Sequence, residues 1–187
     1  RLVSCGRPPV FVRVEMMDEV GNLVAQGKWG EIVVRGTLVS LGYYGDPEAS
    51  EANRAHGWHH TGDIGYKDED GFIYIVDRKK DMIISGGLNV FPIEIERLIW
   101  SHPAVQDCAV IGVPDDKWGE AVKAVVELED GKTASEAEII ALCKGKLSAY
   151  KAPKTVEFWD ELPRSGVGKV LKRKVRERFW AGHERKI

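Results

Sequence analysis

The sequence has 187 residues, which is enough for one domain or two small ones. Its hydrophobic content of 43% and charged content of 30% are ordinary for a globular protein. The formal net charge of −2 argues against a polyanion-binding surface, so we expect no nucleic acid partner. No apolar run approaches the ~20 residues that a transmembrane helix needs, so we expect no membrane span.

The three cysteines, Cys5, Cys108 and Cys143, are scattered and form no C-x-x-C pair. An odd and scattered set argues against a disulfide framework and against a zinc site. The cysteine pattern therefore predicts a protein of the reducing cytoplasm.

The first part of the chain is typical of strands. Residues 9–17 alternate apolar and charged side chains with a period of two, and residues 31–35 predict a second strand. The dipeptide Asp46-Pro47 begins a short polar helix, because proline suits the first helical position. Residues 64–77 predict a hairpin. Together these segments form a small β-rich unit.

The remainder of the chain mixes helices and strands. Apolar residues at helical spacing predict helices at residues 92–100 and 171–180, and Ser135 with Glu138 forms a capping-box signature ahead of a third helix. Apolar, β-branched runs predict further strands at residues 104–113, 121–128 and 155–159.

The boundary between the two parts falls in the charged stretch at residues 78–81, between two apolar strands. The predicted fold class is α+β. A small β-rich unit occupies residues 1–79, and a compact mixed α/β domain occupies residues 80–187.

Three polar, glycine-bearing segments follow in order: His59–Asp63 (HHTGD), Asp77–Glu96 (DRKKDMIISGGLNVFPIEIE) and Pro163–Lys169 (PRSGVGK). Each puts charge beside glycine in an expected turn or loop, where the backbone approaches a ligand closely. On a tight turn, the Asp63 carboxylate suits a vicinal diol, or alternatively caps the turn before the next strand. Lys169 offers a point charge to a transferring phosphoryl group, or alternatively belongs to a solvated basic face.

Together, in this order, the three segments resemble the C-terminal third of the acyl-adenylate-forming enzymes, from about Gly6 to the end of the chain. The type that they resemble is the acyl-CoA synthetase, that is, the fatty-acid and aryl-acid CoA ligases. The resemblance implies an AMP-forming acid–thiol ligase. Such an enzyme uses ATP, with Mg²⁺, and CoA to convert a fatty or aromatic carboxylic acid to acyl-CoA through an acyl-adenylate.

The sequence lacks the family's upstream Ser/Thr/Gly-rich loop that ends in Lys-Gly and holds the ATP phosphates, and it opens on Arg1 rather than Met. The acyl pocket of the family also lies mostly in the larger N-terminal region. We therefore expect a fragment that is not active alone and whose partner is the missing N-terminal domain of the same chain. Residues 1–79 would end that large domain, and residues 80–187 would form the mobile C-terminal domain.

The resemblance implies roles for four residues in nucleotide chemistry and motion. Asp63 matches the aspartate that binds the ribose hydroxyls of ATP. Arg78 matches an arginine that reaches the ribose and phosphate, for which a guanidinium fork is suited. Lys80 falls at the pivot between the domains, although residues 77–81 also fit a solvated charge run. Lys169 matches the catalytic lysine.

The resemblance also implies a CoA site. Gly86 and Gly87 match the turn that lines the tunnel for the thiol arm, where bare backbone is needed. Without the resemblance they fit an ordinary hairpin turn. Trp118, Tyr150 and Lys154 are the candidates for the CoA nucleotide, through ring stacking on adenine and a lysine contact to phosphate, against packing aromatics and a surface lysine.

No metal site in the protein is expected, because adjacent histidines such as His56, His59 and His60 are more typical of a solvated loop. Two other functions stay open. One is an adenylation domain that loads a carrier protein instead of CoA. The other is a stand-alone binding module without catalysis.

Overall fold

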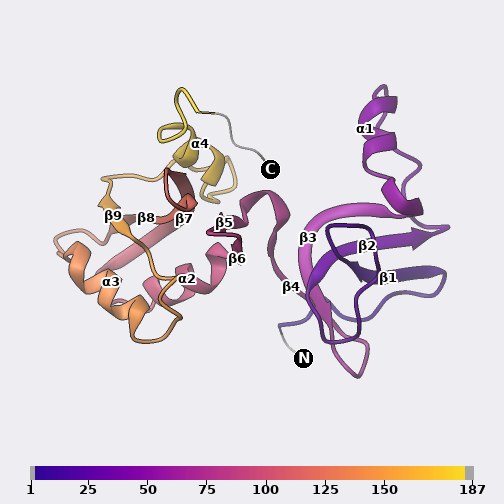
Figure 1. Ribbon diagram of the computed structural model, residues 1–187, viewed down its shortest axis with the longest axis horizontal. Coiled ribbons are helices and arrows are strands. Elements are labelled where there is room, and N and C mark those ends of the chain that lie inside the picture. Colours follow the sequence, from indigo (N-terminus) through magenta and orange to yellow (C-terminus); the bar gives the residue numbers. More distant parts are fainter. Residues whose placement is uncertain (1–2, 184–187) are drawn as a thin grey trace. The chain divides into compact units, whose positions relative to one another are not determined.

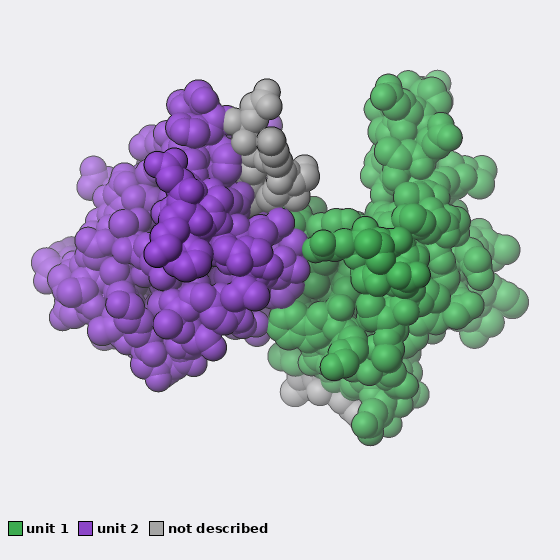
Figure 2. Space-filling view, in the orientation of Figure 1, with its two compact units in different colours: residues 1–80 green, residues 81–187 purple. Residues whose placement is uncertain are grey.

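The computed structural model describes residues 3–183 (Figure 1). The chain divides into two compact units, residues 1–80 (unit 1) and residues 81–187 (unit 2), which Figure 2 colours separately. Both units combine a largely antiparallel sheet with short helices, so the predicted α+β fold class is confirmed. In the part of the chain that the structure describes, no helix is long and apolar enough to cross a membrane.

Unit 1 is built on an antiparallel sheet with the strand order β1-β2-β3-β4. Its elements are β1 (Val12–Met17), β2 (Gly30–Gly36), α1 (Pro47–Ala52), the 3-10 turn η1 (Ala55–Gly57), β3 (His59–Lys67) and β4 (Ile73–Arg78). Successive side chains of a strand point to opposite faces, so Met16 and Ile32 are buried in one cluster and Met17 and Val33 in another. The sheet therefore carries apolar side chains on both faces.

Local signals set the ends of the first elements. β1 begins at Val12 rather than at residue 9, because Phe11 has a left-handed backbone with φ 72° and the Val12 amide donates to the Pro9 carbonyl at 3.2 Å. The predicted short helix is confirmed as α1. Its N-cap is Asp46, whose carboxylate accepts from the Ala49 amide at 2.9 Å.

Unit 2 is built on a five-stranded sheet in which β8 is central. Its elements are β5 (Ile83–Ser85), β6 (Leu88–Val90), α2 (Pro92–Ile99), β7 (Val105–Asp115), β8 (Gly119–Leu128), α3 (Glu136–Lys144), β9 (Thr155–Phe158) and α4 (Lys172–Glu177). β7 runs antiparallel along one side of β8, while β5 and the parallel strand β9 pair with its other side. The 3-10 turn η2 (Lys79–Asp81) spans the junction between the units.

Helices cover both faces of the central hairpin β7–β8. On one face, Val110 packs in a cluster with Ile95 of α2 and Ile139 of α3. On the other face, its neighbour Ile111 packs in a cluster with Val175 of α4 (Figure 1). The apolar run of β7 is therefore buried on both sides, which is why its sequence lacks polar alternation.

The helix predicted at residues 171–180 is shorter in the structure, where α4 ends at Glu177. Tertiary contacts of the aromatic side chains that follow explain the early end. Trp180 Nε1 donates to the Gly112 carbonyl at 2.9 Å, and the Phe179 ring stacks on Trp159 with 6.3 Å between centroids. These contacts outweigh the modest helical propensity of the segment.

Candidate functional site

Asp63 and Arg78 are cross-strand partners in the β3–β4 ladder of unit 1. Arg78 Nε lies 2.7 Å from Asp63 Oδ1, and the side chains are 57% and 22% exposed, respectively. Strand register therefore brings together two residues that the sequence placed in separate motifs. Their pairing gives an accessible site with both a hydrogen-bond acceptor and a fixed positive charge.

The segment before Asp63 was predicted as a tight turn, and this prediction is wrong. His59–Asp63 is the first part of strand β3, and the register against β2 shifts there, so that the segment bulges. Gly62 has φ 73°, the conformation that glycine provides in such a bulge. The Thr61 hydroxyl donates to the Ile32 carbonyl at 2.7 Å and accepts from the Asp63 amide at 3.1 Å. The bulge thus sets the direction of the Asp63 side chain.

Glu31 of β2 is a buried carboxylate that holds this bulge, and the sequence analysis did not identify it. It is 6% exposed and accepts from the Gly62 amide at 3.2 Å. His60 Nδ1 lies 2.9 Å and Lys79 Nζ 2.8 Å from Oε2 of Glu31. Burial raises the pKa of Glu31, but hydrogen bonds from Lys79 and His60 outweigh it, so the pKa lies below its ordinary value of 4.5. The sequence signal that could have identified Glu31 is a glutamate at the start of an apolar strand.

The proposed pivot Lys80 lies in η2, directly after Lys79. Glu31 therefore holds the residue that precedes Lys80. His59 and His60 lie in strand β3 rather than in the solvated loop expected from the sequence. Among residues 3–183, no group of three His, Cys, Asp or Glu side chains is arranged to bind a metal ion.

Gly86 and Gly87 form the two-residue turn of the β5–β6 hairpin in unit 2. Their φ values of 58° and 78° match the turn type that favours glycine at both positions. The Gly86 amide donates to the Trp118 carbonyl at 2.9 Å, and a Cβ on Gly86 would lie 2.7 Å from Trp118 Cε3. Trp118 therefore packs against bare backbone at Gly86, whereas a Cβ on Gly87 would meet no atom within 4 Å.

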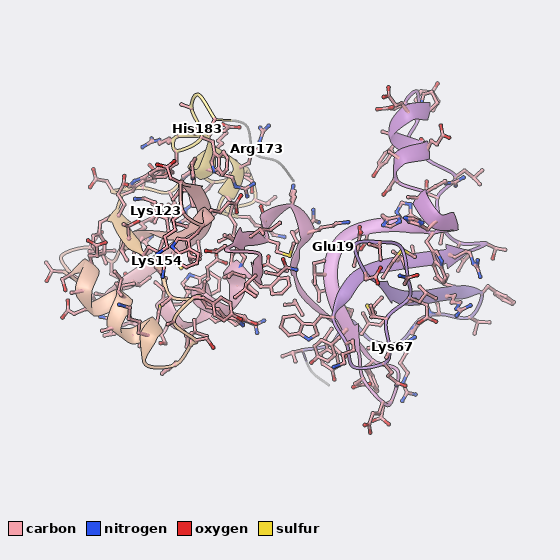
Figure 3. The ribbon with its side chains drawn as sticks, viewed as in Figure 1. Glu19, Lys67, Lys123, Lys154, Arg173 and His183 are labelled. Carbon is pink, nitrogen blue, oxygen red and sulfur yellow. The ribbon has the colours of Figure 1, made fainter. Side chains whose placement is uncertain are left out.

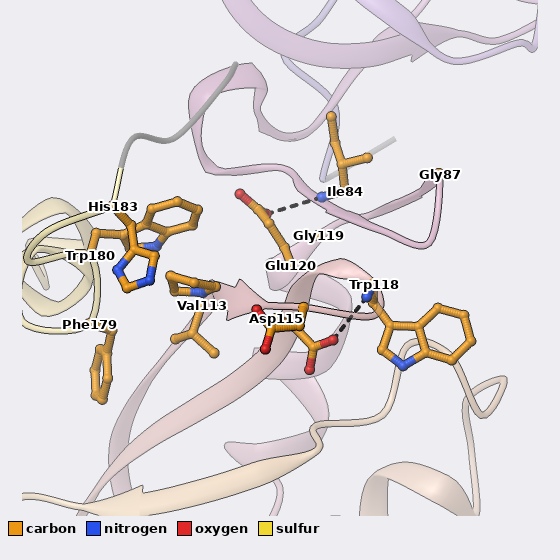
Figure 4. Close-up of a pocket in the computed structure, with 12 residues that line it drawn as sticks. Ile84, Gly87, Val113, Asp115, Trp118, Gly119, Glu120, Phe179, Trp180 and His183 are labelled. Atoms are coloured by element: carbon orange, nitrogen blue, oxygen red, sulfur yellow. Dashed lines mark hydrogen bonds between the residues drawn. The ribbon is translucent and has the colours of Figure 1, made fainter.

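A pocket of about 870 Å³ opens beside this turn (Figure 4). Its lining includes Gly87, Asp115, Trp118, Trp180 and His183. The Asp115 carboxylate accepts from the Trp118 amide at 2.9 Å, which fixes the loop between β7 and β8. The pocket wall therefore combines aromatic rings, which can stack on a planar ligand, with acidic side chains.

Tyr150 and Lys154 belong to the segment that leads into β9, and neither lines this pocket among the described residues. Tyr150 is 38% exposed, with Lys151 Nζ 6.0 Å from its ring centroid. The Lys154 amide donates to the Val122 carbonyl at 2.8 Å, and its side chain is exposed (Figure 3). The structure thus joins Trp118 to Gly86 but does not join all three predicted CoA-nucleotide residues in one pocket.

Lys169 is exposed and lies at the end of a loop. Hydrogen bonds within this loop connect its end to its beginning. The Ser165 amide donates to the Lys169 carbonyl at 2.8 Å, and the Gly168 amide donates to the Ser165 carbonyl at 2.8 Å. The Lys169 amide also donates to Ser165 Oγ at 3.2 Å. The loop therefore has a defined backbone that presents the Lys169 ammonium to solvent.

The two buried cysteines are not suited to nucleophilic chemistry. Burial raises the pKa of the Cys143 thiol to about 11. Burial, together with the charge of Glu96, also raises the pKa of Cys108. A thiol with a raised pKa is mostly protonated near neutral pH and is therefore a weak nucleophile.

Comparison with known families shows what the chain is similar to. Residues 94–169 match the family described as AMP-binding enzyme C-terminal domain, so unit 2 contains a domain of this family. Over its length the chain is related to the C-terminal part of the acyl-adenylate-forming enzymes of the acyl-CoA synthetase type. The resemblance stated from the sequence is confirmed.

Individual relatives show which enzymes the chain is similar to. The chain is 48% identical over 194 residues to a medium/long-chain-fatty-acid–CoA ligase of Mycobacterium tuberculosis, covering 100% of this chain and 34% of that protein. It is 48% identical over 179 residues to a feruloyl-CoA synthase of an Amycolatopsis species, covering 96% and 36%. The solved structure of ATP-bound MatB from Rhodopseudomonas palustris has a TM-score of 0.88 at 39% identity, covering 97% and 37%. The chain spans about a third of the length of the curated relatives it matches.

Proposed function

We propose that the full-length protein containing this chain, the parent, is an acid–thiol ligase. In the first half-reaction a carboxylate oxygen attacks the α-phosphate of ATP, the bond to the β-phosphate breaks, and acyl-AMP and pyrophosphate form. In the second, the thiolate of CoA attacks the acyl carbon and AMP leaves, which yields acyl-CoA. Relatives named as fatty-acid and feruloyl CoA ligases support a fatty or aromatic acid as the substrate.

The observation that carries this proposal is the exposed Lys169 at the end of a hydrogen-bonded loop. Two anions, the carboxylate and ATP, must approach each other in the first half-reaction, and charge accumulates on the transferring group. A preorganised ammonium stabilises that charge in the transition state more than in the ground state. Lys169 is thus the catalytic residue of acyl-AMP formation.

Asp63 and Arg78 of unit 1 bind the nucleotide in this proposal. The Asp63 carboxylate accepts hydrogen bonds from the ribose hydroxyls, and Arg78 contacts the ribose and phosphate oxygens. Their ion pair at 2.7 Å supports this role, because it holds each side chain ready for a ligand. Mg²⁺ enters on the ATP phosphates, as in other phosphoryl-transfer reactions.

Besides Lys169, unit 2 supplies residues for the second half-reaction. In this proposal the Gly86-Gly87 turn lines the path of the thiol arm, and Lys80 is the pivot about which residues 80–187 move against the domain that ends at residue 79. The residues assigned to the CoA nucleotide are Trp118, Tyr150 and Lys154. Exposure of Trp118 beside the Gly86-Gly87 turn supports the assignment most directly. A cytoplasmic location of the parent stays a prediction.

The test is an assay of both half-reactions with the purified parent. With ATP and a panel of fatty and aromatic acids, we expect pyrophosphate release and acyl-AMP, and with CoA added we expect acyl-CoA and AMP. The isolated chain, assayed in parallel, should form neither product. Release of ADP, or no acid-dependent pyrophosphate, would overturn the proposal, whereas acyl-AMP without transfer to CoA would favour a carrier-protein acceptor.

A further inference from the structure

Three ion pairs, formed by two cations, bracket the loop that presents Lys169. Before the lysine, Arg164 Nη1 lies 2.6 Å from Asp107 Oδ2 and Arg164 Nη2 lies 3.0 Å from Glu127 Oε2. After it, Lys172 Nζ lies 2.9 Å from Glu96 Oε2. Both ends of the loop are therefore tied to acidic side chains of the sheet and its helix.

Two of the three carboxylates in these pairs, Glu127 and Glu96, are buried in unit 2. Glu127 is 5% exposed and also accepts from the Leu162 amide at 2.8 Å. Glu96 is 2% exposed and also accepts from the Val110 amide at 2.8 Å. Because backbone donors fix both carboxylates, each is a rigid point of attachment for its cation.

Arg164 also contacts the loop itself. Its backbone forms an isolated β-bridge with Val170, and its Nη1 lies 3.4 Å from the Gly168 carbonyl oxygen. A planar guanidinium has donors in a rigid fork and can bind these acceptors at the same time. The ammonium of a lysine is a compact point charge and lacks this fork. One side chain therefore connects β7, β8 and the two arms of the loop.

We propose that Arg164 is a positioning residue for Lys169, and that its tie to Asp107 and Glu127 holds the loop where the ammonium meets the transferring phosphoryl group. This inference rests on the proposed function, because it assumes that Lys169 acts in acyl-AMP formation. The Lys169 side chain is long and flexible, so the position of its ammonium depends on the position of the loop backbone. Lys172 and Glu96 fix the same loop where it enters α4.

An exposed ion pair nearby provides a contrast. Arg173, which is labelled in Figure 3, lies on α4 with Glu177. Their charged atoms are 3.6 Å apart, and their side chains are 81% and 59% exposed, respectively. Exposed pairs of this kind contribute little. Arg173→Gln is therefore a matched control that removes a nearby arginine and its ion pair without touching the loop.

The experiment measures the two half-reactions of the parent separately. Arg164→Gln should slow acyl-AMP formation by about 10- to 100-fold, since misplacement of a reacting group by about 1 Å has effects of this size. The same variant, given pre-made acyl-AMP and CoA, should form acyl-CoA near the wild-type rate. Arg164→Lys, which keeps the charge but not the fork, should recover acyl-AMP formation only in part. Arg173→Gln should leave both rates unchanged.

Loss of Arg164 alone leaves Glu127 buried without its cation, which can unfold a domain. The double variant Arg164→Gln with Glu127→Gln removes both charges and keeps an acceptor for the Leu162 amide. Thermal melting checks that it is folded, and we expect the same selective loss of acyl-AMP formation. Equal losses in both half-reactions, or no loss in either, would overturn the inference.

Lys169→Ala in the same assay separates this inference from the function on which it rests. If Lys169→Ala abolishes acyl-AMP formation and the Arg164 variants do not impair it, the inference alone fails. If Lys169→Ala itself leaves acyl-AMP formation intact, the proposed role of Lys169 fails, and the role of Arg164 fails with it.

Discussion

The two units position their candidate residues by different means. In unit 1, Asp63 and Arg78 meet because they are register partners on adjacent strands, and a bulge directs the aspartate. In unit 2, Lys169 and the Gly86-Gly87 turn lie on loops, and the Lys169 loop is tied down by long-range ion pairs. A site on a sheet keeps its geometry through the ladder, whereas a site on a loop needs added contacts to do so.

This difference matches the tasks that we propose for the units. Nucleotide binding is needed in both half-reactions and suits a rigid ladder. Lys169 and the Gly86-Gly87 turn act in one half-reaction each, so they lie on separate loops of one unit. Breaking a loop contact should therefore affect one half-reaction, and breaking a ladder contact should affect the binding of ATP.

The largest effect is expected for Lys169→Ala in the parent. Acyl-AMP formation should fall by roughly 10²–10³-fold, the cost of removing one preorganised transition-state donor. Single-turnover measurement of pyrophosphate release checks this. Lys174→Ala, which removes another exposed lysine of the same region, should leave the rate unchanged. Equal losses in the two variants would show that general positive charge, not Lys169, matters.

A smaller effect is expected for Asp63→Ala. The KM for ATP should rise by about 10- to 100-fold, because a hydrogen bond to a charged group contributes roughly 1.5–3 kcal/mol. Steady-state kinetics with ATP varied measures the change, and Glu69→Ala in the exposed β3–β4 turn is the control. An unchanged KM with normal turnover would refute the ribose assignment.

The smallest effect concerns Glu31 and acid stability. Its pKa is lowered in the folded state, so its contribution to the free energy of unfolding is present above the ordinary pKa of 4.5 and is lost as the pH falls through the folded pKa. Glu31→Gln should lower the free energy of unfolding of this chain by about 1 kcal/mol at pH 7. The difference from wild type should shrink as the pH falls below 4.5.

Denaturant unfolding of both proteins at a series of pH values gives the measurement. A difference that stays constant down to about pH 3, well below the ordinary pKa of 4.5, would mean that the carboxylate charge is not what stabilises unit 1.

Short-range patterns in the sequence predicted most of the elements. The capping box is confirmed, since Ser135 Oγ accepts from the Glu138 amide at 3.3 Å and Glu138 Oε2 accepts from the Ser135 amide at 2.7 Å. The strands predicted at residues 104–113 and 121–128 are confirmed as β7 and β8. They could be predicted because their apolar, β-branched runs are long. In each case the signal and the structure that it predicts lie within a few residues of each other.

Contacts between distant segments were not predicted. The bulge at His59–Asp63 depends on the partner strand and on Glu31, neither of which the motif contains. The pair of Arg164 with Asp107 joins residues that the sequence separates widely, and no periodicity marks it. Which residues carry the chemistry therefore stays a prediction from the sequence, whereas tertiary pairing determines how the candidate residues are held.

The most direct test of the account compares Lys169→Ala with Gly87→Leu in the parent, each assayed in both half-reactions. Gly131→Leu is the control for backbone strain, because Gly131 has φ 71° and Gly87 has φ 78°, and a Cβ at either position meets no atom within 4 Å. We predict that Lys169→Ala loses acyl-AMP formation and keeps transfer to CoA, that Gly87→Leu shows the reverse, and that Gly131→Leu keeps both. If Lys169→Ala and Gly87→Leu impair the same half-reaction, separate loops do not serve separate steps and the account is wrong.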